Sequence, residues 1–252
     1  MVICQTPFRI SFFGGGTDYP AWYKEHGGAV LSTTINKYGY ITCRQLPPFF
    51  EHKHRIVYSK IENVREISEI DHPSVKAVFN FLKVEDGLEI HYDGDLPARS
   101  GIGSSSSFTV GLINTLNAFR GNLKSKQELA EETIHIEQNI IKETVGLQDQ
   151  VAAAFGGLNR INFLTNGKFE VRPVIVQTAR SEELNDNLLL FFTGFSRIAE
   201  TVAKSKIENF KTKEKHLHRM RAMVDEAQSI LQSPNAKIAD IGTMLHEAWM
   251  LK

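Results

Sequence analysis

A loop rich in glycine and serine, between a predicted strand and a predicted helix, is the feature that most constrains this chain. Alternating apolar residues over 88–92 predict the strand, and the apolar pattern over 104–119 predicts the helix. Gly101 and Gly103 let the backbone turn tightly and approach a ligand closely. The amides of a first helical turn and the helix dipole favour anions, so the loop has the composition of a phosphate-binding site.

Two common nucleotide-binding motifs do not fit this loop. A Walker loop requires G-x-x-x-x-G-K-[ST], which occurs nowhere in the chain. The dinucleotide motif G-x-G-x-x-G fails because Ser106 stands at the position of its third glycine. The plainer alternative is a Gly/Ser linker or a generic helix cap, but a linker is unusual between a strand and an apolar helix.

The rest of the chain predicts mostly strands first and helices later. Expected strands cover residues 8–13, 28–35, 39–45, 55–58, 158–163, 169–174 and 188–193. Expected helices cover residues 74–84, 148–155, 199–210, 213–231 and 238–251. A further helix begins at Ser125, which forms a capping-box pattern with Glu128. This order of elements predicts an α+β fold, with a soft domain boundary in the polar stretch 175–187.

The composition is that of an ordinary globular protein. Lys plus Arg and Asp plus Glu each number 29 among the 252 residues, so the formal net charge is zero and we expect no nucleic-acid partner. The apolar runs are too short to span a bilayer and the N-terminus lacks a signal-peptide pattern, so we expect no membrane partner and a cytoplasmic location. The two cysteines, Cys4 and Cys43, argue against a disulfide-rich or Cys-rich zinc framework.

Three segments of the chain resemble, in the right order, the motifs of the GHMP small-molecule kinases. Residues 97–108 are similar to the second motif of that family, residues 9–20 to its N-terminal substrate motif, and residues 146–150 to the segment with its catalytic aspartate. The Gly-Gly-Gly-Thr-Asp-Tyr run at 14–19 and Leu-Pro-Pro-Phe-Phe-Glu-His at 46–52 look most like the branch that acts on D-glycero-D-manno-heptose 7-phosphate. The Gln-Asp-Gln of the third segment agrees with that branch, and L-fucose kinases are its neighbours.

The resemblance implies a GHMP-kinase-like two-domain α+β fold, with an N-terminal domain at residues 1–180 and the start of a C-terminal domain at residues 181–252. It implies an ATP-dependent sugar kinase that phosphorylates the anomeric hydroxyl of the heptose 7-phosphate to a 1,7-bisphosphate, for nucleotide-heptose and surface-polysaccharide synthesis. The family's third, glycine-rich motif has no counterpart after Gly157, so we expect an incomplete C-terminal domain. The alternatives are a kinase of a free sugar such as L-fucose, and a non-catalytic sugar or nucleotide sensor on the same fold.

The resemblance also implies roles for individual residues. Asp149 is the expected catalytic base, and Arg9 is expected to stabilise both its charge and that of the transferred phosphoryl group. The sugar or sugar phosphate would contact the glycine turn through Gly15, Gly16, Thr17 and Asp18. The ATP phosphates would contact Pro97, Arg99, Ser100, Gly101, Ile102, Gly103, Ser104, Ser105 and Ser106. Mg²⁺ would be bound by Ser105 and Glu137, with Glu143 as a weaker alternative.

Several of these residues also have a purely structural explanation. Asp149 precedes an alanine-rich segment and can be a helix N-cap. Asp18 can simply form the glycine turn, and Glu137 can belong to a solvated helix face. His216 and His218 lie two residues apart on a predicted helix, so they do not share a face and do not predict a metal site.

Overall fold

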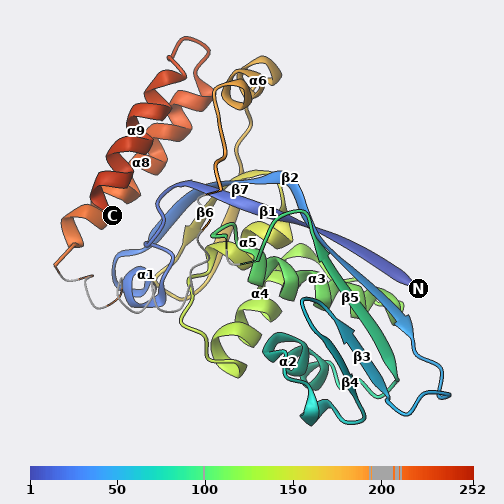
Figure 1. Cartoon of the computed structure of the whole chain (residues 1–252). Helices are drawn as coiled ribbons and strands as arrows, with labels where there is room; N and C mark the ends of the chain where they lie inside the picture. Colours follow the sequence, from blue (N-terminus) through green and yellow to red (C-terminus); the bar gives the residue numbers. More distant parts are fainter. Residues whose placement is uncertain (99, 193, 195–206, 208–209, 211) are drawn as a thin grey trace. The chain divides into compact units, whose positions relative to one another are not determined.

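The computed structural model of the chain describes residues 1–98, 100–192, 194, 207, 210 and 212–252 (Figure 1). These residues form two compact units, each assembled from discontinuous segments. The first unit comprises Met1–Phe8, Ile35–Val145 and Asp149–Phe155, and the second comprises Arg9–Thr34, Gly146–Gln148 and Gly156–Lys252. The sequence predicts one boundary near residue 180, whereas strands β1 (Val2–Phe13) and β2 (Gly28–Gln45) each contribute residues to both units.

The first unit contains the three strands that immediately precede the glycine–serine loop. Strand β3 (His54–Val57) pairs in parallel with β5 (Leu88–Gly94) and antiparallel with β4 (Ile61–Val64). Strand β5 also runs antiparallel to the C-terminal half of β2, with Gly39 opposite Gly94. The loop that follows β5 therefore starts from a strand that is hydrogen-bonded on both sides.

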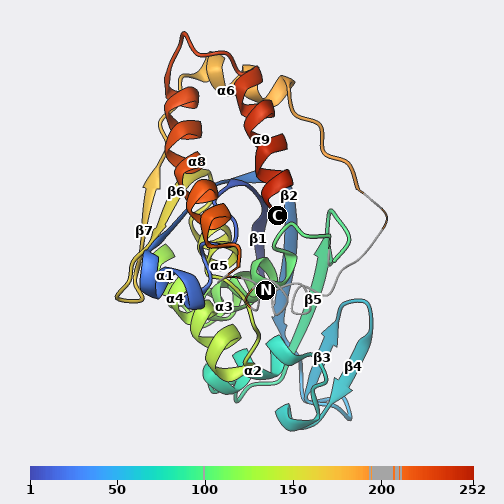
Figure 2. The same cartoon turned by 90° about the vertical axis from the view of Figure 1, so that its left-hand side faces the viewer.

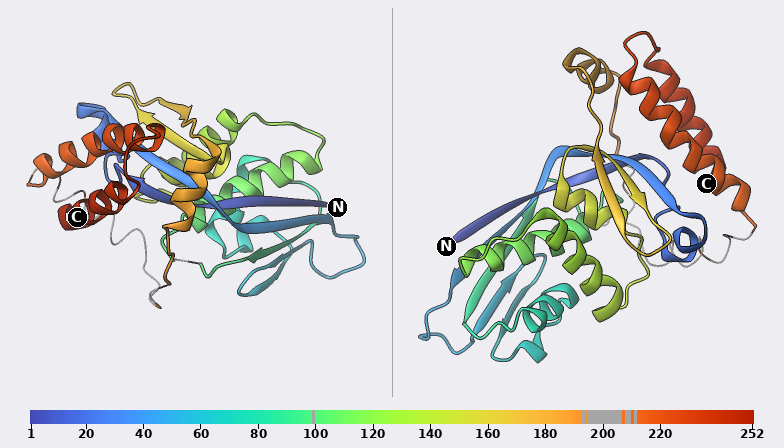
Figure 3. Two further views of the ribbon diagram at one scale, coloured as in Figure 1. Left: turned by 90° about the horizontal axis from the view of Figure 1, so that it is seen from above. Right: turned by 180° about the vertical axis from the view of Figure 1, so that it is seen from behind.

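Helices cover one face of these strands (Figure 3). They are α2 (Pro73–Phe81), α3 (Ser104–Phe119), α4 (Lys126–His135) with the π-helical turn η2 (Ile136–Ile140), and α5 (Gln148–Phe155); a short 3-10 turn, η1 (Ile67–Glu69), precedes α2. Their shared core is almost fully buried and includes Ile41, Ile56, Ile90, Val78, Phe79, Leu112 and Ile113. The period-2 strand pattern and the apolar helix faces meet in this core, which is the α+β arrangement.

The capping box that begins α4 is confirmed. The Ser125 hydroxyl accepts from the Glu128 amide at 3.2 Å, and the Glu128 carboxylate accepts from the Ser125 amide at 2.8 Å. Helix α4 then passes directly into the π-helical turn η2, where the hydrogen bond from the Ile141 amide reaches back to the Ile136 carbonyl. Such π-helical turns are frequent at functional sites.

The second unit contains a hairpin and a helix pair. Strand β6 (Leu158–Phe163) pairs with the N-terminal half of β2 and with β7 (Phe169–Pro173), both antiparallel, and β1 also pairs with β2. Helices α8 (Glu214–Gln232) and α9 (Ala239–Leu251) lie side by side (Figure 2). The core of this unit joins them to the strands through Phe12, Phe13, Leu31, Met223, Val224, Ala227, Leu231, Ile241 and Met244. The remaining helices are α1 (Pro20–His26) and α6 (Thr178–Asp186).

Most predicted elements are confirmed, but residues 28–35 and 39–45 form one strand rather than two. The strand predicted at 188–193 is wrong: residues 188–192 form no strand, and the side chains of residues 189–192 are exposed. An apolar run becomes a buried strand only where another strand offers an edge, and no described strand pairs with this one. The polar stretch 175–187 contains α6, and the helix predicted at 199–210 falls almost wholly outside the described residues. No helix in the described part of the chain is long and apolar enough to cross a membrane.

Gly14 provides a test of the turn that follows β1. Its φ is +84°, and a Cβ at this position would lie 1.9 Å from the Ala29 carbonyl oxygen. We expect Gly14→Ala to lower the free energy of unfolding by roughly 2–4 kcal/mol, because backbone strain and steric overlap act together. Urea denaturation measures this change.

The matched control is Gly242→Ala, an exposed position inside α9 where a Cβ meets nothing within 4 Å. Alanine there should leave the stability unchanged or raise it by up to about 1 kcal/mol, because alanine loses less entropy in a helix than glycine does. Equal stabilities of the two variants would contradict the placement of the Gly14 turn.

Candidate functional site

The glycine–serine loop leads into α3, which spans Ser104–Phe119 as predicted. Gly103 is the N-cap residue, has a left-handed φ of +73°, and contributes no side chain to the cap. Gly101 also has a positive φ, +79°, and a Cβ there would meet nothing within 4 Å. Open space therefore borders the loop backbone just before the helix N-terminus, where an anion is electrostatically favoured.

The other loop residues differ in exposure. Pro97 and Ser105 are exposed, whereas the buried or half-buried members are Ser100, Ile102, Gly103, Ser104 and Ser106. The Ser100 hydroxyl donates to the Pro97 carbonyl at 2.7 Å and closes the turn before the glycines. Arg99 lies outside the described residues. Contact between this loop and ATP stays a prediction.

Glu137, on the π-helical turn η2, is the most buried acidic group near this loop, with 1% of its surface exposed. Its Oε2 accepts hydrogen bonds from Ser106 Oγ at 2.9 Å and from Gln150 Nε2 at 2.6 Å. Its Oε1 is buried and has no hydrogen-bond partner among the described residues. The alternative of a solvated helix face is therefore wrong for Glu137.

The serine that contacts Glu137 is Ser106, whereas the resemblance pairs Glu137 with Ser105 in binding the metal. Ser105 is exposed, and its carbonyl accepts a hydrogen bond from Thr109 Oγ1 at 3.2 Å. The roles of Ser106 and Gln150 beside Glu137 were missed from the sequence. The Gln-Asp-Gln run was the available signal for Gln150, but its side-chain direction depends on how α5 packs.

Burial raises the pKa of Glu137 to about 7. The neighbouring Gln150, Thr109 and Ser106 side chains oppose this shift, while the negative charge of Glu143 adds to it. Glu143 is close because its amide donates to the Glu137 carbonyl at 2.8 Å. A buried carboxylate with one unpartnered oxygen, next to hydroxyl groups, is an all-oxygen donor set that fits Mg²⁺ better than zinc.

In the second unit, the glycine turn and the segment 146–148 meet at the carboxylate of Asp18, which is 1% exposed. Its Oδ1 accepts from the Gly16 amide at 3.0 Å and its Oδ2 from the Gln148 amide at 3.5 Å. The Leu147 amide donates to the Asp18 carbonyl at 3.1 Å. A Cβ on Gly146 would lie 1.8 Å from Oδ2, so only glycine leaves room for this contact. Two of the three predicted motifs are thus held together by direct bonds.

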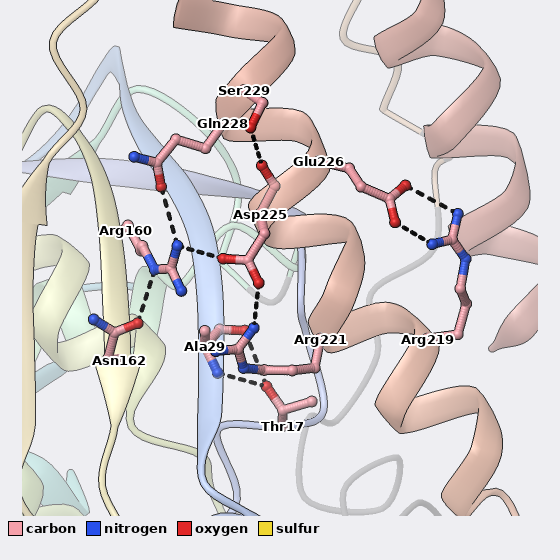
Figure 4. A network of polar contacts seen from close by, with 10 residues as sticks. All are labelled: Thr17, Ala29, Arg160, Asn162, Arg219, Arg221, Asp225, Glu226, Gln228 and Ser229. Atoms are coloured by element: carbon pink, nitrogen blue, oxygen red, sulfur yellow. Dashed lines mark hydrogen bonds and ion pairs between the residues drawn. The ribbon is translucent and has the colours of Figure 1, made fainter.

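The Thr17 side chain ties the same turn to β2 (Figure 4). Its hydroxyl lies 2.8 Å from the Gly14 carbonyl and 3.0 Å from the Ala29 carbonyl, and it accepts from the Ala29 amide at 3.1 Å. The hydroxyl is fully buried and would have to leave these bonds to reach a substrate. Substrate contact stays a prediction for Gly15, Gly16, Thr17 and Asp18.

Helix α8 packs against this turn, which the sequence did not reveal. Arg160 of β6 pairs with Asp225 of α8, and Arg221 contacts the same carboxylate at 2.8 Å (Figure 4). These ion pairs accompany the apolar packing of Val224, whose Cγ2 lies 2.8 Å from where a Gly14 Cβ would be. The turn is therefore enclosed by backbone on one side and by α8 on another.

Asp149 lies in the first turn of α5, directly after Gln148, the residue whose amide donates to Asp18. Arg9 is half-buried on β1. Asp149 belongs to the first unit and Arg9 to the second. Their convergence on an acceptor hydroxyl stays a prediction. The N-cap alternative for Asp149 is wrong, because α5 begins one residue earlier, at Gln148, and Asp149 is already helical.

The chain is similar in sequence to known proteins. Residues 73–157 match the family described as the GHMP kinases N terminal domain. The chain is 28% identical to D-glycero-alpha-D-manno-heptose 7-phosphate kinase of Campylobacter jejuni, over 98% of this chain and 76% of that protein. It is also 28% identical to a galactokinase of Pyrococcus furiosus, over 78% of this chain and 54% of that one.

Solved structures share the fold. A D-glycero-D-manno-heptose 1-phosphate kinase from Bacteroides thetaiotaomicron has a TM-score of 0.85 at 24% identity, over 100% of this chain and 79% of that one. Mevalonate kinase of Methanococcus jannaschii has a TM-score of 0.68 at 20% identity, over 99% and 78%. The predicted GHMP-kinase-like α+β fold is confirmed.

The raised pKa of Glu137 predicts a pH-dependent stability. Its ordinary pKa is 4.5 and the folded value is about 7, so the folded protein binds this proton more tightly than the unfolded chain. Stability from this group is therefore present below about pH 4.5 and is lost as the pH rises through about 7. Glu137→Gln has no such titration. The free energy of unfolding of this variant, relative to that of the wild type, should therefore rise by up to about 3 kcal/mol as the pH is raised from acidic values to pH 8.

Urea unfolding at a series of pH values, with a chelator present, measures this difference. The control is Glu131→Gln, which changes an exposed carboxylate of α4. A stability difference between Glu137→Gln and the wild type that is constant with pH would contradict the prediction.

Proposed function

We propose that this chain, whose residues 73–157 form a GHMP kinase N-terminal domain, is an ATP-dependent kinase of the anomeric hydroxyl of D-glycero-D-manno-heptose 7-phosphate. The product, a 1,7-bisphosphate, would serve nucleotide-heptose and surface-polysaccharide synthesis. The observation that carries the proposal is the contact of Asp18 with residues 146–148. This contact holds the glycine turn, which is the expected substrate motif, against Gln148. Gln148 directly precedes Asp149, the expected catalytic base.

The first unit would hold the nucleotide. The loop glycines and the first amides of α3 would bind the ATP phosphates, where the helix dipole favours negative charge. Ser105 and Glu137 would bind Mg²⁺, and Ser106 would orient the Glu137 carboxylate through their hydrogen bond. Bound Mg²⁺ neutralises charge on the transferred phosphoryl group. The raised pKa of Glu137 supports this assignment, because a cation offsets the penalty of burying the ionised form.

The second unit would present the acceptor. Gly15 is half-buried, and a Cβ there would meet only Ser11 Oγ at 3.9 Å, so a sugar would approach the turn at Gly15. Gly16 is buried, and a Cβ there would lie 3.2 Å from Leu217 Cδ2, so its contact with a sugar would require α8 to shift. Asp149 accepts the proton of the acceptor hydroxyl while the oxygen of that hydroxyl attacks the γ-phosphorus of ATP. The bond between that phosphorus and the bridging oxygen breaks, and ADP leaves with the electron pair. Arg9 stabilises the ionised Asp149 and the charge on the phosphoryl group.

Asp149→Asn tests the catalytic step. Asparagine has nearly the same size as aspartate and keeps one side-chain oxygen, so the variant removes the negative charge and the proton acceptor with little change of shape. We expect kcat to fall by roughly 10²–10⁴-fold, with a much smaller change in KM, in an ADP-release assay. The control is Asp186→Asn, which changes an exposed carboxylate at the end of α6. Turnover near the wild-type level in Asp149→Asn would leave Asp149 as a helix-stabilising residue only.

The acceptor is tested with a panel of substrates in the same assay. We expect kcat/KM to be highest for heptose 7-phosphate and roughly 10²-fold lower for the unphosphorylated heptose, because a site that binds the 7-phosphate leaves its polar groups unpaired without it. L-Fucose and galactose complete the panel. A preference for L-fucose would favour the free-sugar kinase, and ADP release unaffected by every sugar would favour the non-catalytic sensor.

A further inference from the structure

Outside the candidate kinase site, three side chains that can bind a transition metal meet in the second unit. His26 is the last residue of α1, Glu214 is the first residue of α8, and His218 lies one turn further along α8. One ligand atom from each residue lies within 4.8 Å of the other two. His218 of α8 therefore lies near His26, which is on another helix. His216, two residues from His218 in the sequence, is not part of the cluster.

The distances suit a small cation. A tetrahedral zinc ion with bonds of about 2.0–2.1 Å separates its ligand atoms by about 3.3 Å. His218 Nε2 lies 3.7 Å from Glu214 Oε1, and His26 Nε2 lies 3.7 Å from Oε2 of the adjacent Glu25. The side chains of Glu214 and His218 are each 54% exposed, so small torsional changes can close the remaining gap.

A buried tryptophan holds both imidazoles in place. Trp22 is 2% exposed, and its ring centroid lies 4.1 Å from that of His26 and 5.0 Å from that of His218. The two imidazole centroids are 5.2 Å apart. Aromatic packing alone can account for the positions of these three rings. It does not account for the carboxylate of Glu214, which lies within reach of both imidazoles. Packing that orients ligand side chains in advance is what a metal site needs.

We propose that His26, Glu214 and His218 form a Zn²⁺ site, with water or Glu25 in the fourth position. Two imidazoles and a carboxylate are a donor set for Zn²⁺, whereas Mg²⁺ and Ca²⁺ prefer oxygen ligands alone. The site is distinct in chemistry from the oxygen-rich surroundings of Glu137. Bound zinc would clamp the end of α1 to the start of α8, and α1 begins two residues after Asp18.

Titration of the whole chain with Zn²⁺ in excess Mg²⁺, followed by calorimetry, tests the proposal. We expect one saturable site per chain, and His26→Asn and His218→Asn should each weaken zinc binding by roughly 10–100-fold or more. The control is His216→Asn, an exposed histidine of α8 outside the cluster, which should bind zinc as the wild type does. Zinc at about 100 times its Kd should raise the thermal midpoint of the wild type and control by roughly 5–10 °C.

A spectroscopic measurement separates loss of the site from loss of the fold. Cobalt(II) in the wild type should show the strong visible absorption of tetrahedral coordination, and Glu214→Gln, an exposed change at a helix start, should lose it while keeping its circular dichroism spectrum. The proposal is overturned by absence of saturable zinc binding, by wild-type affinity in both the His26 and His218 variants, or by an equal loss in His216→Asn.

Discussion

The buried carboxylate of Asp18 is the interaction on which the candidate substrate site depends. A carboxylate with 1% exposure is stable only where donors replace its lost hydration. The amides of Gly16 and Gln148 supply these donors, and Gln148 lies 130 residues from Asp18 in the sequence. A Cβ at position 146 would lie 1.8 Å from Asp18 Oδ2, so the contact favours glycine at position 146 as well as aspartate at position 18. The segment Gly146–Gln148 therefore has a defined position relative to the glycine turn.

Glu137 presents the opposite case in the first unit. It is as deeply buried as Asp18, but one of its oxygens has no hydrogen-bond partner in the described part of the chain, and its pKa is raised. A carboxylate whose donors are complete stabilises structure, whereas one with an unpartnered oxygen is prepared for a proton or a cation. This contrast is the physical reason for proposing Glu137, and not Asp18, as a ligand of Mg²⁺.

The two proposed cation sites differ in the chemistry of their ligands. Around Glu137 the donors are carboxylate and hydroxyl oxygens, which suit a hard ion that arrives with phosphates. At the junction of α1 and α8 the donors include two imidazoles, which suit zinc. Donor type alone would let one chain distinguish two divalent ions, because Mg²⁺ prefers oxygen ligands and zinc accepts imidazoles.

Local patterns in the sequence determined the elements whose signals act over a few residues. The bounds of α3 and α5 and the capping box at Ser125 follow from apolar periodicity and from bonds between near neighbours. The family resemblance also placed Asp18 and Glu137 among the expected site residues. Only the tertiary structure decided that Ser106 faces Glu137, that His218 lies near His26, and that residues 188–192 form no strand. Each of these depends on contacts between segments far apart in the chain, and no pattern within one segment records which distant group will pack against it.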